Sequence, residues 1–125
     1  MFIVGNRYSR KDIYAVLNVP VYRQKGNWAT GYNYYDGAYY VFVNINEPGR
    51  TGHNYENHWE DNLLHWRGKT GSHVRQRSIR KMIDPSTKVH VFARHDNNDT
   101  SFEYIGLGRA HTVKETVPVT VLWEF

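Results

Sequence analysis

Apolar and polar residues alternate with a period of two over much of the second half of the chain. Alternation of this kind is typical of strands with one buried face. It predicts strands at Lys88–Arg94, Phe102–Ile105, Arg109–Lys114 and Val117–Phe125, and Leu63–Trp66 predicts a further short strand.

Residues Gly31–Ile45 predict a β-hairpin. Asp36-Gly37 lies between Tyr-rich flanks, and this dipeptide is typical of a type I′ turn. Beyond the turn, the alternation predicts one face formed by Tyr39, Val41, Val43 and Ile45 and another formed by Tyr40, Phe42 and Asn44.

Two short segments have helical rather than strand spacing. The first begins at Ser9, where Asp12 completes a capping box, and continues through Ile13, Val16 and Leu17 until Pro20 ends it. The second has an apolar face formed by Ile79, Met82 and Ile83, and Asp84-Pro85 closes it.

The pattern as a whole predicts about seven short strands and two short helices, which is a mostly β, α+β fold. A spacing of roughly ten residues between strands favours a barrel or a curled sheet over a parallel α/β layer. The polar segments at 47–52 and 96–99 are expected to be loops. A length of 125 residues predicts one domain, spanning residues 1–125.

Charge is distributed unevenly along the chain. The net formal charge of +4 is the sum of +4 for residues 1–25, −4 for 26–61, +6 for 62–81 and −2 for 82–125. A localised basic segment without any acid, flanked by acidic segments, favours an anionic partner over a merely solvated surface.

Several function classes find little support in the sequence. No cysteine is present, so thiol chemistry is excluded, and the start of the chain lacks the apolar core of a signal peptide. We therefore expect a soluble, cytoplasmic protein with no membrane partner. Gly68-Lys69-Thr70 resembles the end of a phosphate-binding loop, but position 63, where such a loop needs its first glycine, is a leucine.

Catalytic and metal sites are also not predicted. No Asp/Glu-x-Lys motif occurs, which argues against a restriction-type nuclease core. His53, Glu56, His58 and Glu60 are close in sequence, but their spacing does not define a ligand set. The expectation is a chain with no catalytic residue, metal or cofactor of its own.

Two segments combine basic, amide and aromatic residues in the way that DNA-binding surfaces do. Arginine and amide side chains read base edges, whereas Lys, Ser and Thr contact phosphates. Most aromatic residues are assigned to the core, including Trp59, while Trp28, Tyr32 and Trp66 are considered for contacts with bases or sugars. The candidate DNA-binding residues are Arg23, Gln24, Lys25, Asn27, Trp28, Thr30 and Tyr32 in a first arm and Trp66, Arg67, Lys69, Thr70, Ser72, His73, Arg75 and Arg77 in a second.

An ordered set of residues resembles a DNA-recognition domain of bacterial restriction systems. The set covers roughly residues 8 to 125 and consists of Trp28-x-Thr30-Gly31-Tyr32, Phe42-x-Asn44-Ile45, Gly49-Arg50-Thr51-Gly52-His53-x-Tyr55, Leu64-x-Trp66-x-Gly68-Lys69-Thr70-x-Ser72, Phe92-x-Arg94, Phe102-x-Tyr104-x-Gly106 and Pro118-Val119-x-Val121-x-Trp123.

The resemblance is to the B3-like effector or specificity domains of restriction endonucleases, which are related to PUA-like barrels. It implies an open seven-stranded β pseudobarrel with two short helices, whose two arms clamp the major groove of double-stranded DNA. It also implies a monomer on one DNA site, tethered to a nuclease domain that is separate from these residues. None of the matched residues has a catalytic role in that family.

Three alternatives remain open. The first is a reader that flips a modified cytosine into a pocket formed by Trp28, Tyr32, Tyr34, Asp36 and Tyr40. The second is a self-contained nuclease or RNA-processing hydrolase, and the third is a protein-interaction module.

Replacing Arg67 and Lys69 together with alanine is expected to weaken DNA binding at least about tenfold, equivalent to ~1.4 kcal/mol. Both cations lie at the tip of the predicted second arm, where phosphate contacts would be lost. Titration of a labelled duplex measures the change, and unchanged affinity would favour the protein-interaction alternative.

Overall fold

The computed structural model describes residues 1–45, 57–96 and 98–125. Two helices, two 3-10 helices and nine strands are found in this part of the chain. In chain order they are β1 (Arg7–Ser9), α1 (Arg10–Leu17), η1 (Val21–Arg23), η2 (Gly26–Ala29), β2 (Tyr32–Tyr35), β3 (Ala38–Asn44), β4 (His58–Glu60), β5 (Leu63–Arg67), α2 (Arg77–Met82), β6 (Lys88–Arg94), β7 (Ser101–Leu107), β8 (Arg109–Lys114) and β9 (Thr120–Glu124).

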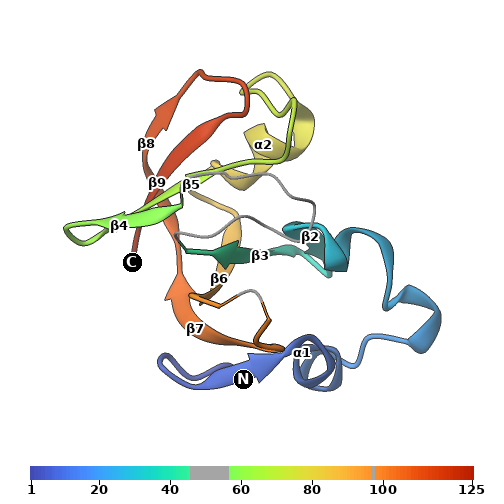
Figure 1. Ribbon diagram of the computed structural model, residues 1–125. Coiled ribbons are helices and arrows are strands. Elements are labelled where there is room, and N and C mark those ends of the chain that lie inside the picture. Colours follow the sequence, from blue (N-terminus) through green and yellow to red (C-terminus); the bar gives the residue numbers. More distant parts are fainter. Residues whose placement is uncertain (46–56, 97) are drawn as a thin grey trace.

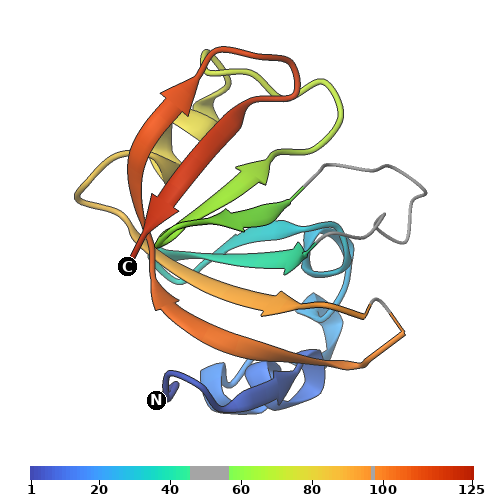
Figure 2. The same cartoon turned by 60° about the vertical axis from the view of Figure 1, so that its left-hand side comes forward.

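The strands form two sheets (Figure 1). Sheet A has the order β1-β7-β6-β3-β2, and sheet B has the order β4-β5-β9-β8. All pairs are antiparallel except β3 with β6, where Ala38 lies opposite Lys88 and Asn44 opposite Arg94. Figure 2 shows the strands of both sheets fanning out from the side where the C-terminus lies. The prediction of a mostly β fold with two helices is confirmed, and the described strands form no closed barrel.

The predicted start of the first helix and the predicted hairpin turn are confirmed in detail. Ser9 caps α1 and accepts a hydrogen bond from the Asp12 N–H at 3.1 Å, while the Asp12 carboxylate accepts one from the Ser9 N–H at 2.8 Å. Asp36 and Gly37 both have positive φ, 48° and 87°, as a type I′ turn requires. The backbone therefore follows the local signals that the sequence carries.

Some boundaries and one core assignment were wrong. The last strand begins at Thr120 rather than Val117, because Pro118 has no N–H to donate to a neighbouring strand. Strands β1 and β4 were missed because three residues are too few to define an alternation. Trp59, assigned to the core, is 38% exposed because it lies on β4, at the edge of sheet B. The predicted loop at 47–52 lies outside the described residues.

Sheet A is covered on both faces, so its strands contribute to two separate cores. One face packs against sheet B and α2 in a cluster that includes Val41, Val91 and Trp123. The other face packs against α1 and the N-terminal segment in a cluster that includes Phe42, Phe92 and Phe102. The predicted alternation on β3 is confirmed, since Val41 and Phe42 belong to different clusters.

A buried arginine supports the second cluster. Arg94 is only 5% exposed, and its Nε donates to the Asn44 side-chain oxygen at 2.6 Å. Its guanidinium carbon lies 4.3 Å from the centroid of the Phe102 ring, and that of Arg10 lies 5.0 Å from the same ring. Arg10 and Arg94 therefore pack within the fold, although they count towards the basic charge of the chain.

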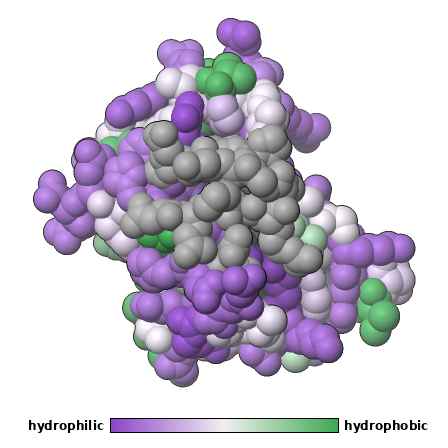
Figure 3. Space-filling model, viewed as in Figure 1, coloured by the Kyte–Doolittle hydropathy of each residue, from purple (hydrophilic) through white to green (hydrophobic). Residues whose placement is uncertain are grey.

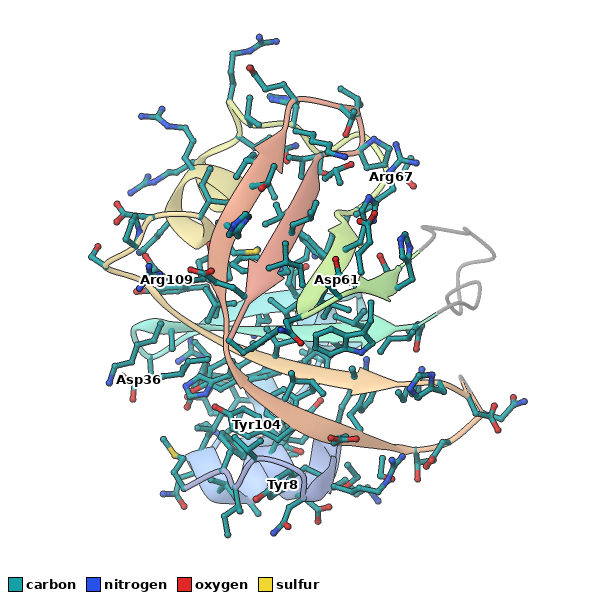
Figure 4. The ribbon with its side chains drawn as sticks, turned by 90° about the vertical axis from the view of Figure 1, so that its left-hand side faces the viewer. Tyr8, Asp36, Asp61, Arg67, Tyr104 and Arg109 are labelled. Atoms are coloured by element: carbon teal, nitrogen blue, oxygen red, sulfur yellow. The ribbon has the colours of Figure 1, made fainter. Side chains whose placement is uncertain are left out.

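A buried histidine in the same cluster makes stability dependent on pH. The His90 ring stacks on Tyr40 at 5.0 Å, and its Nδ1 lies 2.8 Å from the Tyr104 hydroxyl oxygen. Burial, with a smaller effect of Lys88, lowers the pKa of His90 from 6.5 to about 4. Figure 4 shows Tyr104 and Tyr8 together on this side of sheet A.

We expect the free energy of unfolding to fall as the pH drops from 6.5 towards 4, by on the order of 2–3 kcal/mol. In this window the unfolded chain protonates His90 whereas the folded chain keeps it neutral. Urea unfolding at several pH values measures the effect. His90→Gln should flatten the dependence, whereas the control His111→Gln, at an exposed position, should leave it unchanged. An equally steep dependence in His90→Gln would contradict this assignment.

Candidate nucleic-acid interface

A groove of about 450 Å³ lies where the two predicted arms meet. It is lined by Asn27 and Tyr32 of the first arm, by Lys69, Thr70 and Ser72 of the second, and by Asn33, Tyr34, Tyr39, Gln76 and Ser78. Residues more than thirty positions apart in sequence therefore surround one opening. Amide, hydroxyl and tyrosine side chains line it, which are groups able to hydrogen-bond to phosphates, sugars and base edges.

Lys69 joins the two arms directly. Its Nζ donates to the Tyr32 carbonyl oxygen at 3.3 Å and lies 4.2 Å from the centroid of the Tyr32 ring. Burial lowers the pKa of Lys69, and the side chain is only partly exposed. Lys69 is therefore a link between the arms as well as a positive charge at the groove.

Two further cations belong to the rim of the groove. The Nζ of Lys81 lies 3.9 Å from the centroid of the Tyr34 ring, and the Tyr34 ring contacts the edge of Tyr39 at 5.1 Å. Burial and the neighbouring Tyr34 raise the pKa of Tyr39, whereas the nearby charge of Arg77 opposes the shift. Tyr39 therefore keeps its hydroxyl proton at neutral pH, and the cations are not balanced by a phenolate.

The second arm is fastened to the segment that leads into β9. The Gly68 N–H donates to the Val119 carbonyl oxygen at 2.9 Å, and the Val119 N–H donates to the Ser72 carbonyl oxygen at 3.0 Å. The Ser72 hydroxyl oxygen also accepts from the Val119 N–H at 3.2 Å, and Ser72 is only 2% exposed. Ser72 was predicted to contact DNA, but its side chain instead holds the arm in place.

Other second-arm residues shape the loop. The Arg75 N–H donates to His73 Nδ1 at 3.2 Å, and the His73 N–H donates to the Gln76 side-chain oxygen at 3.4 Å. These bonds leave the side chains of Arg75 and Arg77 exposed. In the described residues the ion pairs are Arg7–Asp99 and Arg109–Glu124, so neither Arg75 nor Arg77 is neutralised by a described acid.

Arg67 lies at the end of β5, where its backbone is tied to β3. Its N–H donates to the Asn57 side-chain oxygen at 3.0 Å, and the Asn57 amide nitrogen donates to the Asn44 carbonyl oxygen at 3.3 Å. Arg67 as a whole is partly exposed, but its Nε is buried and has no hydrogen-bond partner in the described part of the chain. In Figure 4 the labelled Arg67 and the acidic Asp36 lie on opposite sides of the molecule. Arg67 is thus separated from the carboxylate of the hairpin turn, whereas the charge of Arg77 acts on Tyr39 of the same hairpin.

The first arm consists of two 3-10 helices on the surface. Arg23, Lys25, Asn27 and Thr30 are exposed there. Gln24 is partly buried, and its side chain donates to the Val19 carbonyl oxygen at 2.9 Å, so it stabilises the arm itself. In the views of Figures 1 and 2 the arm leaves α1 and returns to β2.

The three aromatic residues considered for base or sugar contacts are all buried. Trp28 is 2%, Tyr32 7% and Trp66 3% exposed. The expectation that they present free rings to DNA is wrong, because each lies on the inward-facing side of its element and packs in the core. Local sequence could not reveal this, because the basic and amide residues near these positions are typical of a binding surface whichever way the rings point.

The pocket predicted for a flipped base is not assembled in the structure. Trp28 and Tyr40 belong to one core cluster and Tyr32 to the other, on the opposite face of sheet A. Of the five residues named for that pocket, Tyr32 and Tyr34 line the groove. The sequence analysis did not identify the groove residues Asn33, Tyr39, Gln76 and Ser78. The strand alternation that places Tyr34 on the same face as Tyr32 was the one signal available for this part of the groove.

The glycine of the apparent phosphate loop has a packing role. A Cβ at Gly68 would lie 2.5 Å from the Ser72 hydroxyl oxygen and 3.1 Å from a Val119 methyl carbon. Gly68→Ala should therefore lower the free energy of unfolding by about 1–3 kcal/mol, as overpacking does. Ser72→Gly should recover part of this loss in the double variant, as a double-mutant cycle from urea unfolding would measure. Strict additivity would contradict the predicted clash.

Among the described residues, no three or more His, Cys, Asp or Glu side chains lie close enough together to hold a metal ion. His58 and Glu60 lie on β4, and His53 and Glu56 lie outside the described part of the chain. No helix in the described residues has the length and apolar character needed to cross a membrane.

Comparison with known proteins gives a family but no activity. None of the curated proteins compared with the chain matches it. A family model described as a domain of unknown function, DUF3427, matches residues 2–121. Because the match covers nearly the whole chain, this protein belongs to the DUF3427 family.

Proposed function

We propose that this chain is a double-stranded DNA-binding domain whose two arms contact the major groove. The observation that carries the proposal is the groove between the arms, which has polar lining residues and, beside them, cations that form no ion pair among the described residues. Arg75 and Arg77 are exposed on one side of it, and Arg23 and Lys25 are exposed on the first arm. Arginine is suited both to phosphates and to guanine edges, so the same surface can provide affinity and specificity.

The resemblance to B3-like domains suggests the wider role. Under this proposal the two curved sheets correspond to an open pseudobarrel, and the chain is the effector or specificity domain of a bacterial restriction endonuclease. The chain then acts as a monomer in the cytoplasm, and a tethered domain performs cleavage. The domain itself carries no catalytic residue, metal or cofactor.

Selection of random duplexes on the purified chain tests the proposal. We expect one sequence to be enriched and to bind more tightly than a scrambled duplex of equal length. The logarithm of the binding constant should fall with the logarithm of salt concentration, by about 0.9 per neutralised phosphate. Equal binding of the enriched and scrambled duplexes at moderate salt would exclude sequence-specific recognition.

Incubation of the chain alone with DNA or RNA and Mg²⁺ separates this proposal from the enzymatic alternative. The substrate should remain intact. Cleavage that is lost on replacing His53 or His58 would instead assign a nuclease activity to the chain itself.

A further inference from the structure

The tip of the first arm is an ordered turn with an apolar surface. Helix η1 follows Pro20, and the Arg23 N–H donates to the Pro20 carbonyl oxygen at 2.9 Å. The Gln24 N–H donates to the Val21 carbonyl oxygen at 3.1 Å. The Gln24 side chain donates to the carbonyl oxygen of Val19, which lies just before Pro20. Figure 1 shows this light-blue segment protruding from the rest of the fold. The turn is therefore fixed by backbone bonds that do not involve the side chains at its apex.

Those apical side chains are among the most exposed apolar groups of the described residues. Val21 is 83% and Tyr22 73% exposed. Among the described residues, Tyr22 has neither a ring contact nor a side-chain hydrogen bond. Figure 3 shows a small hydrophobic patch next to hydrophilic residues at the edge of the protruding part of the surface. Because both side chains face solvent, they contribute no buried apolar surface to the stability of the fold.

The charges around the tip indicate what kind of surface covers it. Arg23 follows the apolar pair directly, Lys25 lies two residues further on, and no acidic residue occurs between Ile13 and Tyr35. A shallow depression of about 440 Å³ beside the turn is lined in part by Lys11, Asn18 and Gln24. The partner must therefore be anionic and must also offer apolar surface, as a nucleic acid does through its sugars and base faces.

The tip is continuous with the groove proposed to bind DNA. Three residues separate Arg23 from Asn27, which lines that groove. A duplex held in the groove would pass along the same arm. This continuity favours DNA over an anionic membrane or an acidic protein as the partner of the tip.

We propose that Tyr22, supported by Val21, is an apolar contact of the first arm with bound DNA and packs against sugars and base edges. This inference rests on the proposed function of the groove. Aromatic contacts with nucleic acid contribute affinity without neutralising phosphate. Tyr22 would thus add to binding in a way that differs from every cation of the interface, because its contribution does not depend on counterion release.

Fluorescence anisotropy of a labelled duplex, measured over a series of salt concentrations, tests the assignment. The enriched duplex is used, or a random-sequence duplex at low salt if none is enriched. Tyr22→Ala should weaken binding about tenfold with an unchanged salt slope. Tyr22→Phe should retain binding within about twofold, because the ring rather than the hydroxyl makes the contact. Val21→Ser tests the supporting apolar residue in the same titration. Val4→Ser is its matched control, since Val4 is also exposed, at 66%, and lies outside both arms.

The outcomes separate the two proposals. If the unmodified chain binds no duplex, the proposed function fails and this inference fails with it. If the chain binds DNA and Tyr22→Ala binds equally well, only the contact at the tip is wrong. A reduced salt slope in Tyr22→Ala would also overturn it, because the variant would then act through Arg23 and Lys25. Binding to anionic phospholipid vesicles that depends on Tyr22, without duplex binding, would assign the tip to a membrane instead.

Discussion

Replacing Trp28 with alanine is expected to lower the free energy of unfolding by about 3–5 kcal/mol, as truncation of a buried aromatic residue does. Trp28 is 2% exposed, and its ring packs at 5.4 Å from Tyr14, 5.6 Å from Tyr40 and 5.7 Å from Tyr35. Its carbonyl oxygen also accepts a hydrogen bond from Arg10 Nε at 2.7 Å. Removing the indole would leave a large cavity between α1, η2 and sheet A.

Urea unfolding measures this loss, and Trp59 provides a control of the same residue type. Trp59 is 38% exposed and contacts Phe125 at 5.8 Å, so Trp59→Ala should cost much less. A Trp28→Ala variant with unchanged stability but lost DNA binding would reverse the assignment. In that case the tryptophan would be a base contact after all, and the observed burial would not describe the DNA-free protein.

Replacing Arg75 and Arg77 together with alanine should weaken duplex binding about thirtyfold, equivalent to about 2 kcal/mol. Each arginine is expected to contribute about 1 kcal/mol through one phosphate contact in a solvent-exposed setting. The salt slope should also fall by about 1.8, because two phosphates are no longer neutralised. Both side chains are exposed and make no described ion pair, so stability should change little.

This pair separates binding from folding better than Arg67 and Lys69 do. Lys69 links the two arms through Tyr32, so its loss alters the groove as well as its charge. The control is Lys88→Ala with Arg109→Ala, which removes the same formal charge from residues that do not line the groove; because Arg109 is paired with Glu124, the stability of this variant is measured as well. Equal weakening by both pairs would indicate a response to net charge alone. No weakening by Arg75→Ala with Arg77→Ala would exclude the second arm from the interface.

Much of the local structure could be predicted because it depends on short-range chemistry. The capping box at Ser9 and Asp12 starts α1, and Asp36-Gly37 provides the positive φ values of the hairpin turn. Alternation on β3 assigned Val41 and Phe42 to opposite faces because successive side chains of a strand must point to opposite sides. None of these features requires a contact with a distant segment.

The role of each candidate residue depended instead on contacts between distant segments. Trp28, Tyr32 and Trp66 have the composition of a binding surface around them, yet sheet and helix packing turns their rings inwards. Ser72 holds Val119, forty-seven residues away, and Lys69 holds Tyr32. Strands, turns and basic segments could be located from the chain alone, because they follow from local periodicity and charge. Which polar and aromatic groups reach solvent could not, because burial is a property of the packed sheets and not of any one segment.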